Sequence, residues 1–433
     1  MDTTKLFEAA LGVRPPWRVA GIEFKAGARA GRGRLDIRLD FERGGELPCP
    51  ECRKPCKAHD TDEQTWRHLN FFEHETYLVA RTPRVKCEEH GVLKVEVPWA
   101  RPGSGFTMLF EAYVMALAPE MPMAALARMV GEHDTRLWRV VKRHVEEART
   151  QVDMSEVRSV VVDETSRAKR HSYVTLFLEP KKLDEEGRVA SDARVLFVAD
   201  SRAHGTFHAF VSDLQAHGGA AVNVKDVCMD MSHSYQRGAA EALPWAAVTF
   251  DRFHVMKIVS FALDETRRRE GAGRIELRRS RYLWLSNPSK LSSSQREHLE
   301  SLSATNLLTA KAYQMRLNLQ ALWERRKPER AATYLRRWCN WVLRVAQRPK
   351  DPKKTWVLEV MHKTALTLRA NAQGILNYFR LRMTSGVIES VNSLAQAARA
   401  RARGYRSADT FITMIYLIAG RLRFDLPALT HSR

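Results

Sequence analysis

Hydrophobic and polar residues alternate along the first part of the chain with the period of β-strands. The alternation is clearest in residues 34–41 (RLDIRLDF), and similar runs return at 77–81 and 92–97. Because successive side chains of a strand point to opposite faces of its sheet, a period of two predicts half-buried strands. The segment 98–105 (PWARPGSG) then ends the pattern and reads as a linker. We therefore expect an N-terminal β domain over residues 1–100.

The period becomes helical after this linker. Residues 123–130 (MAALARMV) predict a short helix that ends at Gly131, and Asp134 or Thr135 can cap a second helix around 137–144 (LWRVVKRH). A short helix, a glycine-containing turn and a basic helix follow one another in helix-turn-helix domains, whose second helix enters the major groove of DNA. Any helical hairpin gives a similar pattern, so the basic composition of the chain matters to this interpretation.

We expect three side chains of the second helix to face DNA, namely Arg136, Arg139 and Lys142, within a helix-turn-helix domain over residues 105–150. The 433 residues contain 70 Lys and Arg against 50 Asp and Glu, a net charge of +20, which favours a nucleic-acid partner. The chain has no run of 18 apolar residues and no N-terminal signal sequence. We therefore expect a cytoplasmic, nucleoid-associated protein without a membrane partner.

Residues 157–255 predict an α/β unit. Its candidate strands are SVVV at 159–162, YVTLFL at 173–178, VLFV at 195–198, VCM at 227–229 and AVTF at 247–250. Three strands in succession, followed by alternating helices and strands, predict a mixed sheet with helices on its faces. After His254 the pattern is helical to about Ala419 and rich in Arg and Trp. The length and these changes of pattern predict two to four domains.

Four potential metal ligands form two pairs in the N-terminal domain. Cys49 and Cys52 make a CxxC pair, and Cys87 and His90 make a CxxH pair. Three thiolates and an imidazole suit a closed, tetrahedral site for structural Zn²⁺, and the segment between the pairs contains the strands that a zinc ribbon needs. Unrelated core cysteines are the other explanation.

Two further residues compete for this site. Cys56 and His59 lie close in sequence to the first pair, but they form no second pair of their own. We therefore rank them below the four ligands named above.

Carboxylates follow two of the predicted strands. Asp163 ends the strand at 159–162, Asp230 follows the strand at 227–229, and Glu389 lies near the start of a helix. Such strand ends can converge, and three carboxylates can hold two Mg²⁺ or Mn²⁺ ions for phosphodiester chemistry. A single strand-end Asp is more often a turn former, so the interpretation depends on the group.

Several phrases of the sequence resemble the ISL-three family of insertion-sequence transposases. They are PWAR at 98–101, FT at 106–107, DETS at 163–166, YVT at 173–175, FDRFHV at 250–255, RYLWL at 281–285 and GYR at 404–406. The resemblance extends from about Pro48 to Leu422. It implies an RNase H-like catalytic core with a triad of carboxylates, which it places at Asp163, Asp230 and Glu389.

The same resemblance implies an organisation of the catalytic part. The core would begin with residues 157–255, be interrupted by an all-helical insertion at 256–380, and end with the helices of 381–425, which include Glu389. The fold class expected for the chain is thus multidomain, α+β and α/β: a zinc ribbon, a helix-turn-helix domain, and an RNase H-like mixed sheet with a helical insertion.

Asp251 and His254 are further candidates for the catalytic site. The phrase from Asp251 to His254 looks like the D-x-x-H motif of Mutator-like transposases, which accompanies the triad. Asp251 also follows a strand and is the rival of Asp230 for the second metal-ligand position; we prefer Asp230 because it follows the fourth strand. His254 either positions the substrate or is a structural histidine. One departure from the family is Ser385 in place of Asn before Gly386 and Glu389; since Ser caps helices well, we expect little loss of function.

A basic run follows the helix of Glu389. It consists of Arg399, Arg401, Arg403 and Arg406. With Tyr405, these side chains are expected to grip phosphates and flanking DNA, although a solvated helix face is the simpler alternative.

Together these features predict a DNA transposase of a bacterial insertion sequence. It would bind the terminal inverted repeats, hydrolyse a phosphodiester to free a 3′-OH, and direct that 3′-OH at target DNA without a covalent enzyme intermediate. Its partner is double-stranded DNA, and a homodimer or higher oligomer is expected because two ends must be held. The alternatives are a catalytically silent DNA-binding regulator and a simple metal-dependent nuclease.

Overall fold

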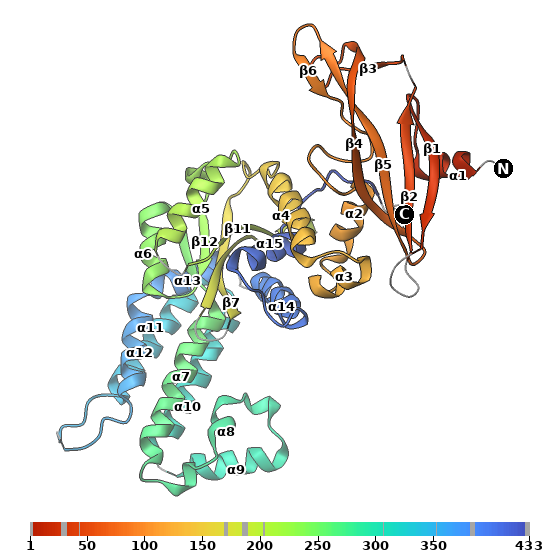
Figure 1. The fold of residues 1–433 in the computed structure, drawn as a ribbon. Coiled ribbons are helices and arrows are strands. Elements are labelled where there is room, and N and C mark those ends of the chain that lie inside the picture. Colours follow the sequence, from red (N-terminus) through yellow and green to blue (C-terminus); the bar gives the residue numbers. More distant parts are fainter. Residues whose placement is uncertain are drawn as a thin grey trace. The chain divides into compact units, whose positions relative to one another are not determined.

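The contacts within the chain divide it into two compact units. The computed structural model describes residues 3–26, 33–42, 44–168, 172–183, 189–201, 204–305, 307–351, 353–381 and 386–428. The first unit comprises residues 1–151, 397–418 and 422–433, and the second comprises 152–396 and 419–421 (Figure 1). Residues 397–418 thus pack with the N-terminal unit, whereas the boundaries expected from the sequence grouped them with the end of the catalytic core.

A six-stranded sheet forms the base of the first unit. Its strands are β1 (Trp17–Lys25), β2 (Arg34–Phe41), β5 (His74–Cys87), β4 (Pro55–Phe71) and β3 (Glu46–Pro48) in spatial order, with β6 (Gly91–Lys94) paired to β5. The alternation in β2 is confirmed for Leu35, Ile37 and Leu39, which are buried, and for Arg38, which is exposed. Asp36 departs from it, because it is buried and paired with Lys25 and Arg34. Helix α1 (Thr3–Leu11) differs from the strand-like reading of residues 1–45. Its sequence is rich in Leu, Ala, Glu and Lys, which favour helix over strand.

Three helices follow the sheet, and they include the predicted helix-turn-helix. Helix α2 (Met108–Leu117) precedes α3 (Met123–Val130) and α4 (Asp134–Thr150). Gly131 ends α3 with a φ of 77°, in the left-handed region that favours glycine. The expected cap of α4 was wrong by one or two residues: the cap is His133, whose ring accepts a hydrogen bond from the Thr135 N–H at 3.3 Å.

The second unit contains the predicted mixed sheet. Its strands are β11 (Arg194–Ala199), β8 (Ser172–Glu179), β7 (Ser159–Ala168), β12 (Asp226–Met229) and β13 (Ala247–Phe250) in spatial order. The pairs β11–β8 and β8–β7 are antiparallel, and β7–β12 and β12–β13 are parallel. Helices α5 (Gly205–Ala216) and α6 (His233–Ala242) connect the later strands, with η1 (Ala221–Asn223) between them. A separate pair is formed by β9 (Lys182–Leu183) and β10 (Val189–Ser191).

The helical pattern expected after His254 is confirmed. The elements are α7 (Arg252–Gly271), η2 (Ile275–Leu277), α8 (Arg281–Leu285), η3 (Pro288–Lys290), α9 (Ser293–Ala304), α10 (Leu308–Gln320), η4 (Ala321–Glu324), α11 (Pro328–Val345), α12 (Glu359–Ala370), α13 (Ala372–Leu381), α14 (Gly386–Arg401) and α15 (Ala408–Ala419). Buried side chains of α7 to α13, such as Trp284 and Trp338, join those of the sheet in one apolar core. Among the described residues, no helix is both long and apolar enough to cross a membrane.

A buried ionic network ties the linker to the helices of the first unit. The carboxylate of Glu111, 1% exposed, accepts hydrogen bonds from Arg101 Nε at 2.8 Å and Nη2 at 2.9 Å and from Ser104 Oγ at 2.7 Å. It also lies 2.7 Å from His144 Nε2 on α4. Burial alone would raise the pKa of Glu111, but the hydrogen bonds from His144, Arg101 and Ser104 lower it below its ordinary value. The carboxylate is therefore held in its ionised form.

Replacement of this carboxylate tests the network. We expect Glu111→Gln to destabilise the first unit by about 3–5 kcal/mol, because buried cationic partners lose their counter-charge. Since the folded pKa of Glu111 is lowered, its stabilising contribution is complete above the unfolded pKa and is lost as the pH falls through the folded value. Urea unfolding of the full chain at neutral and acidic pH measures both effects.

The matched control is Asp62→Asn, which removes an exposed partner of Lys94 in the same unit. Its effect should stay within about 1 kcal/mol. Equal urea midpoints for the two variants would contradict a stabilising role of the network.

Candidate active site and metal cluster

The four predicted zinc ligands converge at one end of the first sheet. Cys49 and Cys52 lie in the turn between β3 and β4, Cys87 is the last residue of β5, and His90 lies in the turn between β5 and β6. One ligand atom from each lies within 4.8 Å of all the others. Cys52 Sγ is 3.7 Å from Cys87 Sγ, and His90 Nδ1 is 3.6 Å from Cys87 Sγ and 4.0 Å from Cys49 Sγ. Three sulfur atoms and one ring nitrogen at such separations fit a tetrahedral Zn²⁺ site.

The local chemistry also favours metal binding. Hydrogen bonds from His90 lower the pKa of the Cys87 thiol to about 6, so its thiolate form is accessible at neutral pH. The competing residues Cys56 and His59 do not belong to the group of four among the described residues. The Sγ atom of Cys56 instead contacts the Lys54 carbonyl oxygen at 3.5 Å.

The strand register aligns three acids at one edge of the second sheet. Strands β7 and β12 are parallel with Cys228 opposite Val161, so Asp230 and Asp163 each lie two residues further along. Strands β12 and β13 are parallel with Met229 opposite Phe250, so the next residues are Asp230 and Asp251. Residues at the same level of parallel strands project to the same face. The three acids therefore share one edge and one level.

Asp251 and His254 form a pair at the start of α7. Asp251 is 2% exposed and caps the helix: its Oδ2 accepts a hydrogen bond from the His254 N–H at 3.2 Å and lies 3.1 Å from His254 Nδ1. This hydrogen bond and the charges of Asp163, Asp251 and Asp230 raise the pKa of His254 above its ordinary value, against the effect of burial. Asp251 is therefore engaged as a helix cap and imidazole partner.

Asp163 and Asp230 lie in an electrostatically crowded place. Burial raises the pKa of Asp163, and the neighbouring charges of Asp230 and Glu164 raise it further, while the Glu164 N–H and His254 act in the opposite direction. One oxygen of Asp230 accepts the Ser232 N–H at 2.8 Å. A partly buried carboxylate whose pKa is raised by burial and by neighbouring acids is an arrangement that a bound cation relieves.

Helix α14 runs past this edge, although it lies more than 220 residues later. Asn392 Nδ2 donates a hydrogen bond to Asp163 Oδ2 at 3.2 Å. One turn on, Gln396 Nε2 donates to Thr165 Oγ1 at 2.8 Å and to the Ser166 carbonyl at 2.7 Å. Glu389 is an exposed residue three positions before Asn392. Residues three or four apart occupy the same face of a helix, so Glu389 lies on the face that meets β7; Ser385 is outside the described residues.

Sequence reasoning missed three residues of this site. Asn392 holds Asp163, and the buried Tyr235 hydroxyl donates to Glu164 Oε1 at 3.1 Å and lies 2.9 Å from Thr175 Oγ1. Asn392 could have been found from its spacing, because it lies three residues after Glu389 and so on the same side of the helix. Glu164 could have been found because it is next to Asp163 in the sequence. Nothing in the local pattern distinguishes Tyr235 from an ordinary core residue.

The three side chains expected to face DNA differ in their surroundings. Arg136 is ion-paired with Glu132 and its guanidinium lies 4.5 Å from the centre of the Phe106 ring. Lys142 is ion-paired with Asp409 of α15. Arg139 is exposed, and its side chain has no ion pair or hydrogen bond within the described part of the chain.

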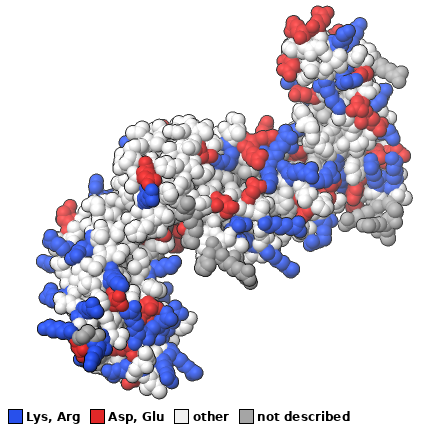
Figure 2. Space-filling view, turned by 60° about the vertical axis from the view of Figure 1, so that its left-hand side comes forward, with Lys and Arg blue, Asp and Glu red and all other residues white. Residues whose placement is uncertain are grey.

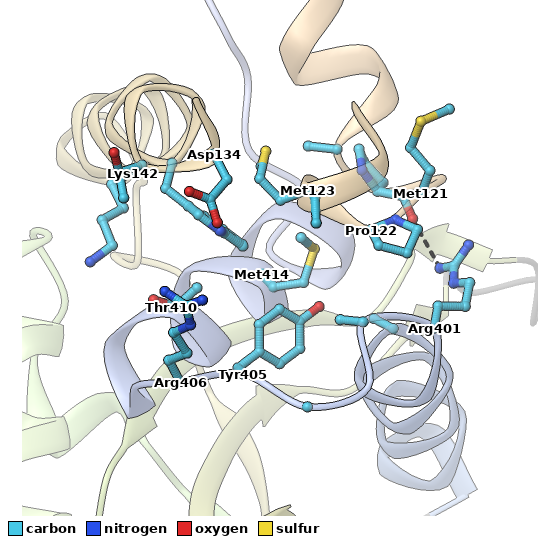
Figure 3. A pocket seen from close by; sticks show the side chains of 18 of the residues that line it. Met121, Pro122, Met123, Asp134, Lys142, Arg401, Tyr405, Arg406, Thr410 and Met414 are labelled. Atoms are coloured by element: carbon cyan, nitrogen blue, oxygen red, sulfur yellow. Dashed lines mark hydrogen bonds between the residues drawn. The ribbon is translucent and has the colours of Figure 1, made fainter. Parts of the chain in front are cut away.

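The C-terminal basic run meets α4 at a hollow of about 490 Å³ within the first unit. In Figure 3, Lys142, Thr410 and Arg406 lie on one side and Arg401 on the other, with Tyr405 and Met414 between them. Arg401 donates hydrogen bonds to the carbonyl oxygens of Pro119 and Glu120, each at 2.9 Å, so it anchors the end of α14. The Arg403 and Arg406 side chains make no such contacts among the described residues.

Three family models match successive parts of the chain. A zinc-finger of transposase IS204/IS1001/IS1096/IS1165 matches residues 46–90, a helix-turn-helix domain of transposase family ISL3 matches 95–145, and a transposase model, also of ISL3, matches 160–415. The third match alone covers more than half of the chain. The first match contains the four clustered ligands, and the second contains α3 and most of α4.

Two curated relatives extend the similarity to the whole length. The transposase for insertion sequence element IS1557 of Mycobacterium tuberculosis is 25% identical, over 99% of this chain and 98% of its own. The transposase for insertion sequence element IS1001 of Bordetella parapertussis is 25% identical, over 85% of this chain and 87% of its own.

The cysteine cluster makes a direct prediction about metal content. We expect the purified chain to contain about one Zn²⁺ ion, and Cys52→Ser to lose it together with part of the stability of the first unit, because structural zinc contributes folding free energy. Elemental analysis of purified protein gives the stoichiometry. Cys56→Ser is the matched control and should keep the ion. The assignment would be contradicted if Cys56→Ser lost the zinc ion and Cys52→Ser kept it.

Proposed function

The chain belongs to the transposase family ISL3, and on that premise we propose that it cuts and joins the ends of an insertion sequence at Asp163, Asp230 and Glu389. The observation that carries the proposal is the register that aligns Asp163 with Asp230, with α14 hydrogen-bonded to Asp163 from across the sequence. This arrangement supports three acids facing one point at the edge of the sheet.

The chemistry expected there has two steps. A water first attacks the phosphorus at the end of the element, the P–O bond breaks, and a 3′-OH is freed. That 3′-OH then attacks a phosphorus of target DNA, so that a new P–O bond forms and a target P–O bond breaks. Neither step needs a Ser or Tyr nucleophile. Two Mg²⁺ or Mn²⁺ ions bound by the three acids would stabilise the charge on the entering and leaving oxygens.

The neighbouring residues position the acids. Asn392 fixes one oxygen of Asp163, and the backbone N–H of Ser232 fixes one oxygen of Asp230. The raised pKa of His254 favours an imidazolium beside the acids, where its charge can hold a phosphate oxygen. Asp251 maintains that charge as its hydrogen-bonded partner. We therefore assign metal binding to Asp230 and a positioning role to Asp251.

We propose that the second sheet is the RNase H-like core of the enzyme. In support, three antiparallel strands are followed by two parallel strands with helices between them; Asp163 lies within the first strand in chain order, which continues past it to Ala168, and Asp230 directly follows the fourth. The helices of residues 256–380 then form the insertion that separates the second acid from Glu389.

DNA recognition is assigned to the helix-turn-helix and the basic residues near it. Helix α4 would read the terminal inverted repeats, and Arg399, Arg403 and Arg406 would grip the adjoining backbone. Arg401 would act mainly by holding the turn in place, because it already binds two carbonyl oxygens. A homodimer or higher oligomer is part of the proposal, since two ends of the element must be brought to one target.

Substitution of the acids tests the catalytic assignment. Asp163→Asn, Asp230→Asn and Glu389→Gln should each lower strand transfer by at least about a thousandfold, since several kcal/mol of transition-state stabilisation is lost. A gel assay with a duplex carrying the element's end and a supercoiled target measures joined products, and a binding assay checks that DNA affinity stays within about threefold.

Asp226→Asn is the control for this series, because Asp226 lies at the other end of β12 and contacts Ser159. It should keep full activity. If Asp251→Asn abolished joining while Asp230→Asn did not, their roles would be reversed. A wild-type chain that binds the ends but never cuts them would be a regulator, and one that cuts without joining would be a nuclease.

The recognition helix makes a separate prediction. Arg139→Ala should weaken binding to the terminal repeat by about 1–3 kcal/mol, because its guanidinium has no competing partner within the described chain and a bidentate base contact is worth about that much. Arg136→Ala and Lys142→Ala should have smaller effects, since both side chains are already ion-paired. Fluorescence anisotropy with the repeat and with an unrelated duplex gives the comparison; the reverse ranking would exclude this reading of α4.

A further inference from the structure

The net positive charge of the protein is concentrated in one part of the chain. Residues 256–380 contain 26 Lys and Arg against 10 Asp and Glu, whereas the remaining residues contain 44 against 40. Figure 2 shows Lys and Arg side chains covering much of the lobe that the helices after β13 form. Such an excess on one lobe is the electrostatic footprint of a polyanion partner.

Not all of these cations are equally available. On α7, Arg267 pairs with Asp264 and Arg268 with Glu265, while Arg269 pairs with Glu359 of α12. By contrast, four exposed side chains just after α7 make no ion pair or hydrogen bond within the part of the chain that the structure describes: Arg274, Arg278, Arg279 and Lys290. These four residues lie in the segment 274–290, where they outnumber the one acid, the exposed Glu276, and we call them the basic corner.

Exposed apolar side chains are interleaved with the basic corner. Ile275 is 71% exposed and Tyr282 is 75% exposed. The guanidinium of Arg281 lies 5.9 Å from the centre of the Tyr282 ring. Arg281 is itself ion-paired with Asp264. One exposed hydrophobic residue is ordinary, but an exposed aromatic ring in a segment rich in exposed cations is the composition of a nucleic-acid surface, in which cations meet phosphates and rings meet sugars or bases.

The backbone of the basic corner is anchored on both sides. Leu277 is 1% exposed, and Trp284 is fully buried with its indole N–H donating to Ser280 Oγ at 3.1 Å. Arg278 and Arg279 lie between these two anchors. Figure 1 shows α8 at the end of α7 that is far from the sheet. The exposed charges are therefore presented from a fixed platform within the second unit.

We propose that the basic corner, together with Tyr282, binds the backbone of target DNA. This inference rests on the proposed function, in which the enzyme must hold a second duplex besides the element's end. Binding through phosphates carries no sequence preference, which suits a duplex of arbitrary sequence. The helix-turn-helix belongs to the other unit, so the end and the target would be held by separate surfaces.

The test is a triple variant, Arg274→Gln with Arg278→Gln and Arg279→Gln. We expect it to bind the terminal-repeat duplex within about twofold of wild type and to cut the end normally. Joining to a plasmid target should fall at least about tenfold. The slope of log affinity against log salt for an unrelated duplex should decrease by up to about 3, because each lost phosphate contact removes about 0.9. Tyr282→Ala should also reduce joining, without changing that slope.

The matched control removes the same charge from the same lobe. Arg336→Gln, Arg337→Gln and Arg344→Gln lie on the exposed face of α11, and their side chains have no partners in the described chain. This control should join DNA as wild type does. If both triple variants lost joining equally, the effect would come from overall charge and the proposal would be overturned. Unchanged joining by the basic-corner variant would also overturn it.

These outcomes are separable from failure of the proposed function. A wild-type chain that neither cuts nor joins would contradict the transposase assignment itself. A wild-type chain that does both, accompanied by a fully active basic-corner variant, would contradict only the assignment of target DNA to this surface.

Discussion

Mutual repulsion among carboxylates at one edge of the second sheet is the constraint on which the site depends. Parallel pairing sets Asp163, Asp230 and Asp251 at one level, and the fold must keep them there although their charges oppose it. All three have fixed partners: Asn392 donates to Asp163, the Ser232 N–H donates to Asp230, and His254 lies against Asp251. Burial above all, and to a smaller extent the charges of Asp230 and Glu164, still raises the pKa of Asp163.

In the first unit, polar groups stabilise two places in the fold. Its long strands β4 and β5 extend to a tip where few apolar side chains are available, and the cysteine cluster joins β3–β4 and β5–β6 there. At the other end of the domain, Glu111 fastens the irregular segment after β6 to α2 and α4. Polar groups with specific geometry thus stabilise the places that a hydrophobic core does not reach.

The sequence contained most of the local structure, because local structure depends on periodicity and on a few special residues. The alternation of residues 34–41, the strand before Asp230, the paired ligands Cys49 to His90 and the turn at Gly131 were all readable in that way. The expectation that Asp163 ends its strand was wrong, because β7 continues to Ala168 through its pairing with β8. The helix at residues 3–11 was missed because the alternation of the following strands was extended back over a segment whose Leu, Ala, Glu and Lys favour helix. His133 was missed as a cap because histidine fills that position only when its ring can reach back to the backbone.

The rest could not be predicted because it depends on contacts between distant segments. No pattern near residue 392 indicates that its amide reaches Asp163, and none indicates that residues 397–418 pack against the N-terminal unit. The sequence shows that Asp230 and Asp251 each follow a strand, but the capping role of Asp251 required the start of α7 to be located. The ion pairs of Arg136 and Lys142 were not predicted either, because their partners lie outside the recognition helix. Arg136 pairs with Glu132, just before α4, and Lys142 pairs with Asp409 of α15.

Helix α7 sets a length scale for the enzyme. It begins beside the acids, at Asp251, and continues for 20 residues to Gly271, just before Arg274. At a rise of about 1.5 Å per residue this is about 30 Å, and successive base pairs of a duplex are about 3.4 Å apart. If the proposed site holds, a straight duplex that follows the helix would touch the far lobe about nine base pairs, close to one turn of DNA, from a phosphate bound at the acids. The length of α7 would then set the spacing of the two contacts, so that the acids and the basic corner meet the same side of the double helix.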